Sequence, residues 1–145
     1  MVNSFCSFEL TINLAQRMNV KTTNRIKVQV DCKYEHAQSS PASNEYLFSY
    51  KVTITNHSDR RVQLIKRKWY ITDYPAIRKI VEGNGVIGQQ PVLEIGDSHS
   101  YVSYCVFKNG IGNMKGYYTF YEFTKYSHFE VEIPEFDMCL PWLKN

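Results

Sequence analysis

The chain has 145 residues, 43% hydrophobic and 21% charged, so it is long enough to bury a core as one domain and too apolar to be disordered. Its net charge of +3 is too small to indicate nucleic-acid binding, which usually requires a strong basic stripe. The sequence shows neither a signal-peptide pattern nor a run of about 18 apolar residues. We therefore expect a cytoplasmic protein that does not insert into a membrane.

Residues 1–21 do not share the pattern of the rest of the chain. Their apolar residues form a weak helical stripe that includes the poor helix formers Thr11 and Asn13. We expect residues 1–21 to be an extension and residues 22–145 to be the folded domain. A second hypothesis places the natural start of the protein at Met18, with the preceding residues translated from upstream sequence.

Two regular strands are predicted in the first third of the domain. Apolar and polar residues alternate from Ile26 to Glu35 and again from Tyr46 to Ile54, which is typical of strands with one buried face. Serines and a proline between them indicate a loop over 36–44. An aromatic content of 14% also favours β-structure, because rings fit a pleated surface.

The third strand, 61–73, is predicted to change face. Leu64 has an even residue number, whereas Trp69 and Ile71 have odd numbers. Strict alternation would therefore place these apolar side chains on opposite faces of the strand. A switch between Leu64 and Lys66 indicates a bulge or a bend between sheets.

The later strands are short and separated by turn residues. They are expected at 77–81, 92–93, 101–107, 117–124 and 128–133. Asn109-Gly110 is a strong turn signal, and Pro134 is expected to end the last strand. Seven or eight strands at about ten-residue spacing, without a crossover helix, predict an all-β fold, an antiparallel β-sandwich.

Three glycines, Gly83, Gly85 and Gly88, have the GxGxxG spacing that can cradle a pyrophosphate. A dinucleotide site also needs a helix directly after the third glycine, and Pro91 opposes one there. A looser nest of loop amides could still bind an anion. Nearby cations available to it are Lys66, Arg67, Lys68 and Arg78. The alternative is that the glycines only shape a loop.

Metal and catalytic motifs are absent from the sequence. The four histidines are scattered and lack metal-ligand spacing: His36, His57, His99 and His128. The cysteines form no CxxC pair, and Cys105 lies within an apolar strand, where a packed thiol is favoured over a nucleophile. We therefore predict no metal site, no cofactor, no catalytic residue and no enzymatic activity.

Aromatic residues gather in the last third of the chain, on both faces of the predicted strands. They are Tyr101, Tyr104, Phe107, Tyr117, Tyr118, Phe120, Tyr121, Phe123 and Tyr126. Only one face of each sheet can fill the core, and exposed rings commonly mark interfaces. This pattern predicts binding to a protein partner, which includes self-association into a homo-oligomer.

Several ordered blocks of the sequence resemble the ApaG family. They are Tyr46-Leu47-Phe48-Ser49-Tyr50, Ile54-Thr55-Asn56, Val62-Gln63-Leu64, 69–73, 85–93, Tyr101 with Ser103 and Cys105, 112–118 and 129–134. The resemblance covers about residues 22–140. Two positions depart from the family pattern: Ser103-Tyr104 replaces a common Ser-Gly, and Ile95-Gly96-Asp97 replaces a common Pro-Gly before an acidic residue.

The resemblance implies an immunoglobulin-like or fibronectin type III-like sandwich. In bacteria such domains stand alone and are associated with cobalt and magnesium resistance or efflux, whereas in eukaryotes they are fused to F-box and polymerase-delta-interacting proteins. Our leading hypothesis is a non-enzymatic module that binds protein and is linked only indirectly to these metals. The alternative is a module that binds a small anion or nucleotide phosphate at Gly83, Gly85 and Gly88.

Overall fold

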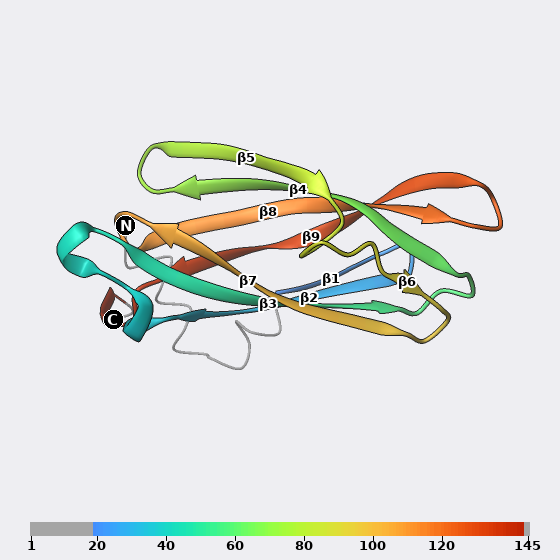
Figure 1. The fold of residues 1–145 in the computed structure, drawn as a ribbon, viewed down its shortest axis with the longest axis horizontal. Helices are drawn as coiled ribbons and strands as arrows, with labels where there is room; N and C mark the ends of the chain where they lie inside the picture. Colours follow the sequence, from blue (N-terminus) through green and yellow to red (C-terminus); the bar gives the residue numbers. More distant parts are fainter. Residues whose placement is uncertain (1–18, 144–145) are drawn as a thin grey trace.

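The computed structural model of the protein describes residues 19–143 as two antiparallel β-sheets packed face to face (Figure 1). The first sheet has the order β1-β2-β3-β7, with bounds Val20–Thr23, Ile26–Tyr34, Tyr46–Asn56 and Ser98–Phe107. The second has the order β5-β4-β8-β9, with bounds Ile77–Asn84, Val62–Asp73, Ile111–Glu122 and Ser127–Cys139. The two-residue strand β6 (Val92–Leu93) also pairs with β4. The predicted sandwich is confirmed.

Short 3-10 helices lie in the connections of the described chain, at His36–Gln38, Pro41–Ser43 and Pro141–Leu143. The start at Met18 and most of the extension predicted for residues 1–21 fall outside the described residues. Val20 and Lys21 already pair with β2 as part of β1.

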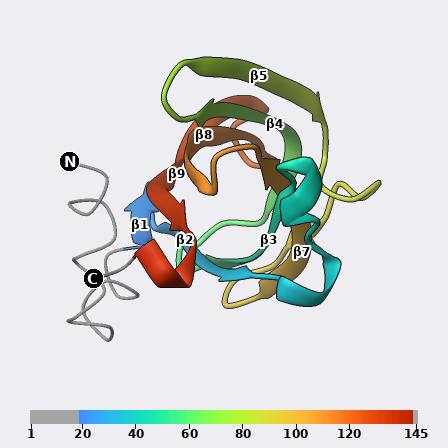
Figure 2. The same ribbon diagram turned by 90° about the vertical axis from the view of Figure 1, so that its left-hand side faces the viewer.

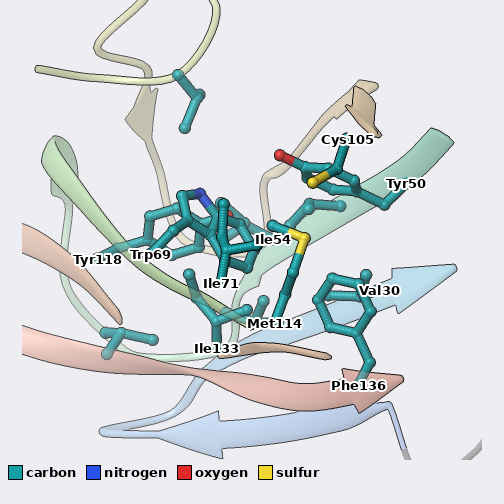
Figure 3. Close-up of a cluster of buried hydrophobic side chains, with 14 of the residues drawn as sticks. Val30, Tyr50, Ile54, Trp69, Ile71, Cys105, Met114, Tyr118, Ile133 and Phe136 are labelled. Atoms are coloured by element: carbon teal, nitrogen blue, oxygen red, sulfur yellow. The ribbon is translucent and has the colours of Figure 1, made fainter. Parts of the chain in front are cut away.

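The core lies between the sheets and is rich in rings (Figure 3). Trp69 is 3% exposed, and its ring lies 5.5 Å from that of Tyr50, 6.1 Å from that of Phe136 and 6.5 Å from that of Tyr118. Edge-to-face contacts of this kind stabilise a core beyond the area that they bury. The alternation predicted for β2 and β3 is confirmed, because Val28 and the other inward aliphatic residues of these strands are buried.

One buried polar side chain organises the turn after β3. The Asn56 amide group donates to the backbone oxygens of Arg60 (2.7 Å), Leu93 (3.1 Å) and Glu94 (3.2 Å), and its carbonyl accepts from the Ser58 N–H (3.0 Å). A fully buried amide needs such partners, because an unpaired polar group is costly inside a protein. Asn56 thereby ties the β3–β4 turn to β6.

The bulge predicted in β4 is confirmed. Leu64 pairs with Phe120 and Lys66 with Thr119, so Ile65 is an extra residue opposite consecutive residues of β8. The extra residue explains the change of parity, and it leaves Leu64, Trp69 and their neighbours of the same face pointing into the core.

Several predicted strand ends are wrong. β7 begins at Ser98 instead of residue 101, and β8 runs over Ile111–Glu122 instead of 117–124. β5 continues past Val81 to Asn84, so Gly83 lies in a strand. Pro134 does not end the last strand, because β9 runs on to Cys139. The register of β9 shifts at this point, where Lys115 stands opposite both Pro134 and Glu135. A proline can lie inside a strand at such a bulge, because its missing N–H is not needed for the ladder.

Candidate functional site

The glycine-rich segment forms a loop that makes a detour along one edge of the second sheet. β5 and β6 pair with different parts of the same strand, β4, and the chain between Asn84 and Val92 leaves the sheet beside the β4 bulge. Gly83 lies in β5, opposite Arg67 in the register. Gly85 and Gly88 lie in the detour itself, so the structure brings the three predicted glycines to one place.

The bulge holds this detour by hydrogen bonds to its extra residue. The backbone oxygen of Ile65 accepts from the Gly85 N–H (2.7 Å) and from the Gln90 side-chain amide (3.0 Å). The Arg67 guanidinium donates to the backbone oxygens of Asn84 (3.1 Å) and Gly85 (2.9 Å). Contacts from both sides of the loop therefore fix its path against β4.

The tip of the loop is a two-residue turn. Val86 and Gln89 exchange backbone hydrogen bonds of 2.8 and 3.0 Å, and the two residues between them, Ile87 and Gly88, have φ values of 47° and 72°. Left-handed conformation at both central positions is typical of a tight hairpin turn. The amides of Gly85, Val86 and Gln89 thus already donate to protein carbonyls. Anion binding at this loop stays a prediction that these contacts do not support.

A second candidate lies on the outer face of the second sheet, where two depressions of about 490 and 630 Å³ adjoin each other. Tyr70, Lys115 and Glu135 line both. Tyr70 and Lys115 are cross-strand partners on β4 and β8, and Glu135 belongs to the β9 bulge that faces Lys115. We call these three residues the Tyr70 row. The strand order β4-β8-β9 places Lys115 between Tyr70 on one side and Glu135 on the other.

The two depressions differ in charge. The larger one lies toward β5 and is also lined by Arg78 and Lys79, whereas the smaller one lies toward β9 and is also lined by Glu130 and Glu132. In the smaller depression, Lys21 of β1 forms an ion pair with Glu132. The outer face is therefore basic on one side of the Tyr70 row and mainly acidic on the other.

Polar contacts beside the row hold its acidic residue in place. The Asn113 side-chain amide donates to Glu135 Oε2 and to Asp137 Oδ1, both at 2.9 Å. Burial raises the pKa of Asp137; the hydrogen bond from Asn113 lowers it in part, and the nearby charge of Glu135 raises it. On β4, the Lys68 ammonium lies 5.4 Å from the Tyr70 ring centroid and 3.1 Å from Glu82 Oε1.

The Tyr70 row was missed in the sequence, although part of it leaves a signal there. Tyr70 has the opposite parity to the core residues Trp69 and Ile71, so it had to point outward once the bulge was placed. Lys115 and Glu135 gave no comparable signal, because both lie outside the strands that were predicted there, 117–124 and 128–133.

The predicted aromatic surface is divided by the structure. Phe107, Tyr118 and Phe120 are core residues, whereas Tyr104 and Tyr126 are 55% and 82% exposed. The remaining outward rings are half-buried, and some of them cover one another. The Tyr121 ring lies 5.2 Å from the Phe123 ring, and the Arg61 guanidinium lies 4.7 Å from the centroid of the Phe123 ring. Exposed rings therefore occur in separate places.

Cys105 is a buried free thiol, as predicted. Burial raises its pKa to about 11, so the thiolate form needed of a nucleophile is scarce at neutral pH. Over residues 19–143, no three His, Cys, Asp or Glu side chains gather in a way that could hold a metal ion. The same part of the chain has no helix of the length and apolarity needed to cross a membrane.

Comparison with known proteins agrees with this fold. A family model described as the ApaG domain matches residues 36–122. A "Protein ApaG" of Vibrio vulnificus strain YJ016 is 40% identical over 121 residues, which are 83% of this chain and 95% of the relative. One of Brucella canis is 42% identical over 119 residues, which are 82% and 91% of the two chains.

A solved structure gives the same result. The crystal structure of the putative ApaA protein from Bordetella pertussis superposes with a TM-score of 0.78 at 38% identity, over 83% of this chain and 97% of that one. The matched family region includes the β4 bulge, the glycine loop and two of the three residues of the Tyr70 row. The chain belongs to the ApaG family.

Proposed function

We propose that this chain is a non-enzymatic binding module that captures a protein partner on the outer face of its second sheet. The observation that carries the proposal is the pair of depressions that share the Tyr70 row. A ring flanked by polar groups in a shallow hollow is a common anchor of protein interfaces, where aromatic residues are enriched. A flat, uniformly polar sheet face would offer no such anchor.

The charges around the row indicate the chemistry of the partner. A segment lying across the face would meet Arg78 and Lys79 on one side and Glu130 and Glu132 on the other. We therefore expect the partner to present acidic groups toward β5 and basic groups toward β9. Such complementarity mainly sets orientation and the rate of association.

Two further parts of the proposal rest on other grounds. The raised pKa of the buried Cys105 thiol supports a role without covalent catalysis. An indirect part in tolerance of cobalt or magnesium in the bacterial cytoplasm is implied by the family resemblance. In this view the partner, and not this chain, handles the metal.

The test compares two tyrosine variants in partner capture from the native host. Tyr70→Ser removes the ring that lines both depressions, and we expect it to lower capture by at least about tenfold, the scale of an interface anchor. Tyr126→Ser is the matched control, because Tyr126 is 82% exposed at a hairpin tip away from the depressions. Thermal unfolding must show that both variants remain folded. Equal capture by the two variants would refute the proposed site.

The metal association needs its own measurement. A strain lacking the gene should regain its normal cobalt sensitivity with the unsubstituted chain or with Tyr126→Ser. It should not regain it with Tyr70→Ser. Full rescue by Tyr70→Ser would separate any role in metal tolerance from this surface.

A further inference from the structure

The edge strands of the two sheets differ in how they are protected from pairing with other chains. β1 has four residues and carries Lys21, which pairs with Glu132 of β9. β5 carries Arg78, Lys79 and Glu82. Charged side chains and short lengths of this kind are what natural proteins use to keep sheet edges from joining.

β7 has none of this protection. Its ten residues, Ser98–Phe107, include no acidic residue, lysine, arginine, proline or glycine. All ten pair with β3 in an unbroken register, so no bulge twists the edge away. In Figure 2, β7 lies beyond β3 at the end of its sheet. The other long edge strand, β9, carries Glu130, Glu132, Pro134 and Glu135, so β7 is the long edge of the described sandwich that lacks Asp, Glu, Lys, Arg and proline.

The outward side chains of β7 change character along the strand. Near its start, the Ser98 and Ser100 hydroxyls form hydrogen bonds of 2.8 and 3.1 Å with threonines of β3. Farther on, Val102, Tyr104 and Val106 are 47%, 55% and 46% exposed. Three successive outward positions of an open edge are therefore apolar, and such a strand readily accepts another strand.

We propose that β7 pairs edge to edge with β7 of a second copy of this chain. The pairing is antiparallel about a two-fold axis at Tyr104. In this register Val102 lies opposite Val106 of the second copy, and Tyr104 lies opposite its own equivalent. The two four-stranded sheets then form one continuous eight-stranded sheet, with an apolar stripe of six side chains across the junction.

Charge identifies a second copy as the occupant. Two-fold pairing brings a strand against itself, so a charged residue near the axis would meet its own like charge. Self-pairing requires a strand without like charges near the axis, and β7 contains no Asp, Glu, Lys or Arg. Its one histidine, His99, lies five residues from Tyr104, outside the segment 101–107 that pairs in this register. An edge built for a different segment would instead gain orientation and partner choice from complementary charges. The proposal does not depend on the Tyr70 row, which lies on the other sheet.

The interface is small, and this sets the expected behaviour. Pairing over one strand is expected to bury less than the ~1,200 Å² of a standard stable interface. We therefore expect a dimer that forms as concentration rises and dissociates on dilution.

Cysteine substitution tests the register directly. Tyr104→Cys places two thiols on the axis with Cα atoms about 4.5–5.5 Å apart, which a disulfide can bridge. Mild oxidation should give a covalent dimer well above the level of the unsubstituted chain. Val102→Cys alone should not, because it faces Val106, whereas Val102→Cys combined with Val106→Cys should. Ile80→Cys, on the edge strand β5 and 60% exposed, is the matched control.

Sedimentation tests the association without cross-linking. The unsubstituted chain should change from monomer to dimer with concentration, Tyr104→Lys should stay monomeric, and Ile80→Lys should behave like the unsubstituted chain. Circular dichroism must show that the variants are folded. A chain that stays monomeric up to ~1 mM overturns the proposal. So does cross-linking that is equal at Ile80 and Tyr104, or protection of β7 amides only when another protein is present.

Discussion

Two bulges distort the second sheet, and they have different structural consequences. The bulge in β4 inserts Ile65, whose backbone oxygen holds the glycine loop through Gly85 and Gln90. The bulge in β9 inserts a residue at Pro134-Glu135 and presents Glu135 beside Lys115 on the outer face. The first bulge therefore uses its backbone to fix a loop, whereas the second uses a side chain to shape a candidate binding surface.

The largest expected effect tests the close packing beside the β9 bulge. A Cβ at Gly116 would overlap the backbone oxygen of Lys68 and lie 3.1 Å from the Trp69 Cα, so Gly116→Ala must push β8 away from β4. We expect a loss of about 3 kcal/mol in the free energy of unfolding, measured by urea denaturation. A loss below that of Gly85→Ala would show that the sheet here is easier to deform than the loop.

A second substitution tests the β4 bulge through its loop. Gly85 has a φ of 63°, and an added Cβ would overlap the backbone oxygen of Gln89. Gly85→Ala should cost about 2 kcal/mol. Gly88→Ala is the matched control: its φ is 72°, but its Cβ would point into open space, so about 1 kcal/mol is expected. Equal losses would mean that the overlap at Gly85 relaxes without cost.

The two bulges also differ in how far the sequence predicts them. The parity change between Leu64 and Trp69 revealed the first, because each side of the bulge has its own clear apolar pattern. The second was hidden, since Pro134 is also a common strand terminator. Both sites also depend on which residues stand opposite each other in the sheet. The hydrogen bond at the loop joins Ile65 and Gly85, which lie twenty positions apart, and the Tyr70 row is assembled from three strands. Apolar periodicity predicts the faces of strands but does not fix which residues stand opposite each other.

Arg67 provides a smaller perturbation of the loop at the first bulge. Arg67→Met keeps most of the aliphatic volume but removes the donors to Asn84 and Gly85. We expect a loss of about 1 kcal/mol in stability and faster hydrogen exchange at the Gly85 and Val86 amides. Lys66→Met, a substitution at an exposed neighbour in the same strand, is the control and should leave both unchanged. Unchanged exchange in Arg67→Met would show that Ile65 alone holds the loop.

The smallest effect concerns pH and the acidic side of the second bulge. The pKa of Asp137 is raised above its ordinary value of 3.8, chiefly by burial, so the folded state binds this proton more tightly than the unfolded state. Stability from this group is therefore present below pH 3.8 and is lost as pH rises through the folded pKa. Asp137→Asn keeps an oxygen for Asn113 and removes the titration.

Urea denaturation between acid and neutral pH measures this difference. As pH rises, the free energy of unfolding of Asp137→Asn should increase by a fraction of a kcal/mol relative to that of the unsubstituted chain, because the variant has no charge to desolvate. Glu130→Gln is the control, since Glu130 is exposed on the same strand and should show no such gain. If Asp137→Asn instead became more stable than the unsubstituted chain as pH falls, the Asp137 carboxylate would be stabilised in the fold. The β9 bulge would then favour negative charge at this end of the outer face, and a basic group of the partner would be expected there.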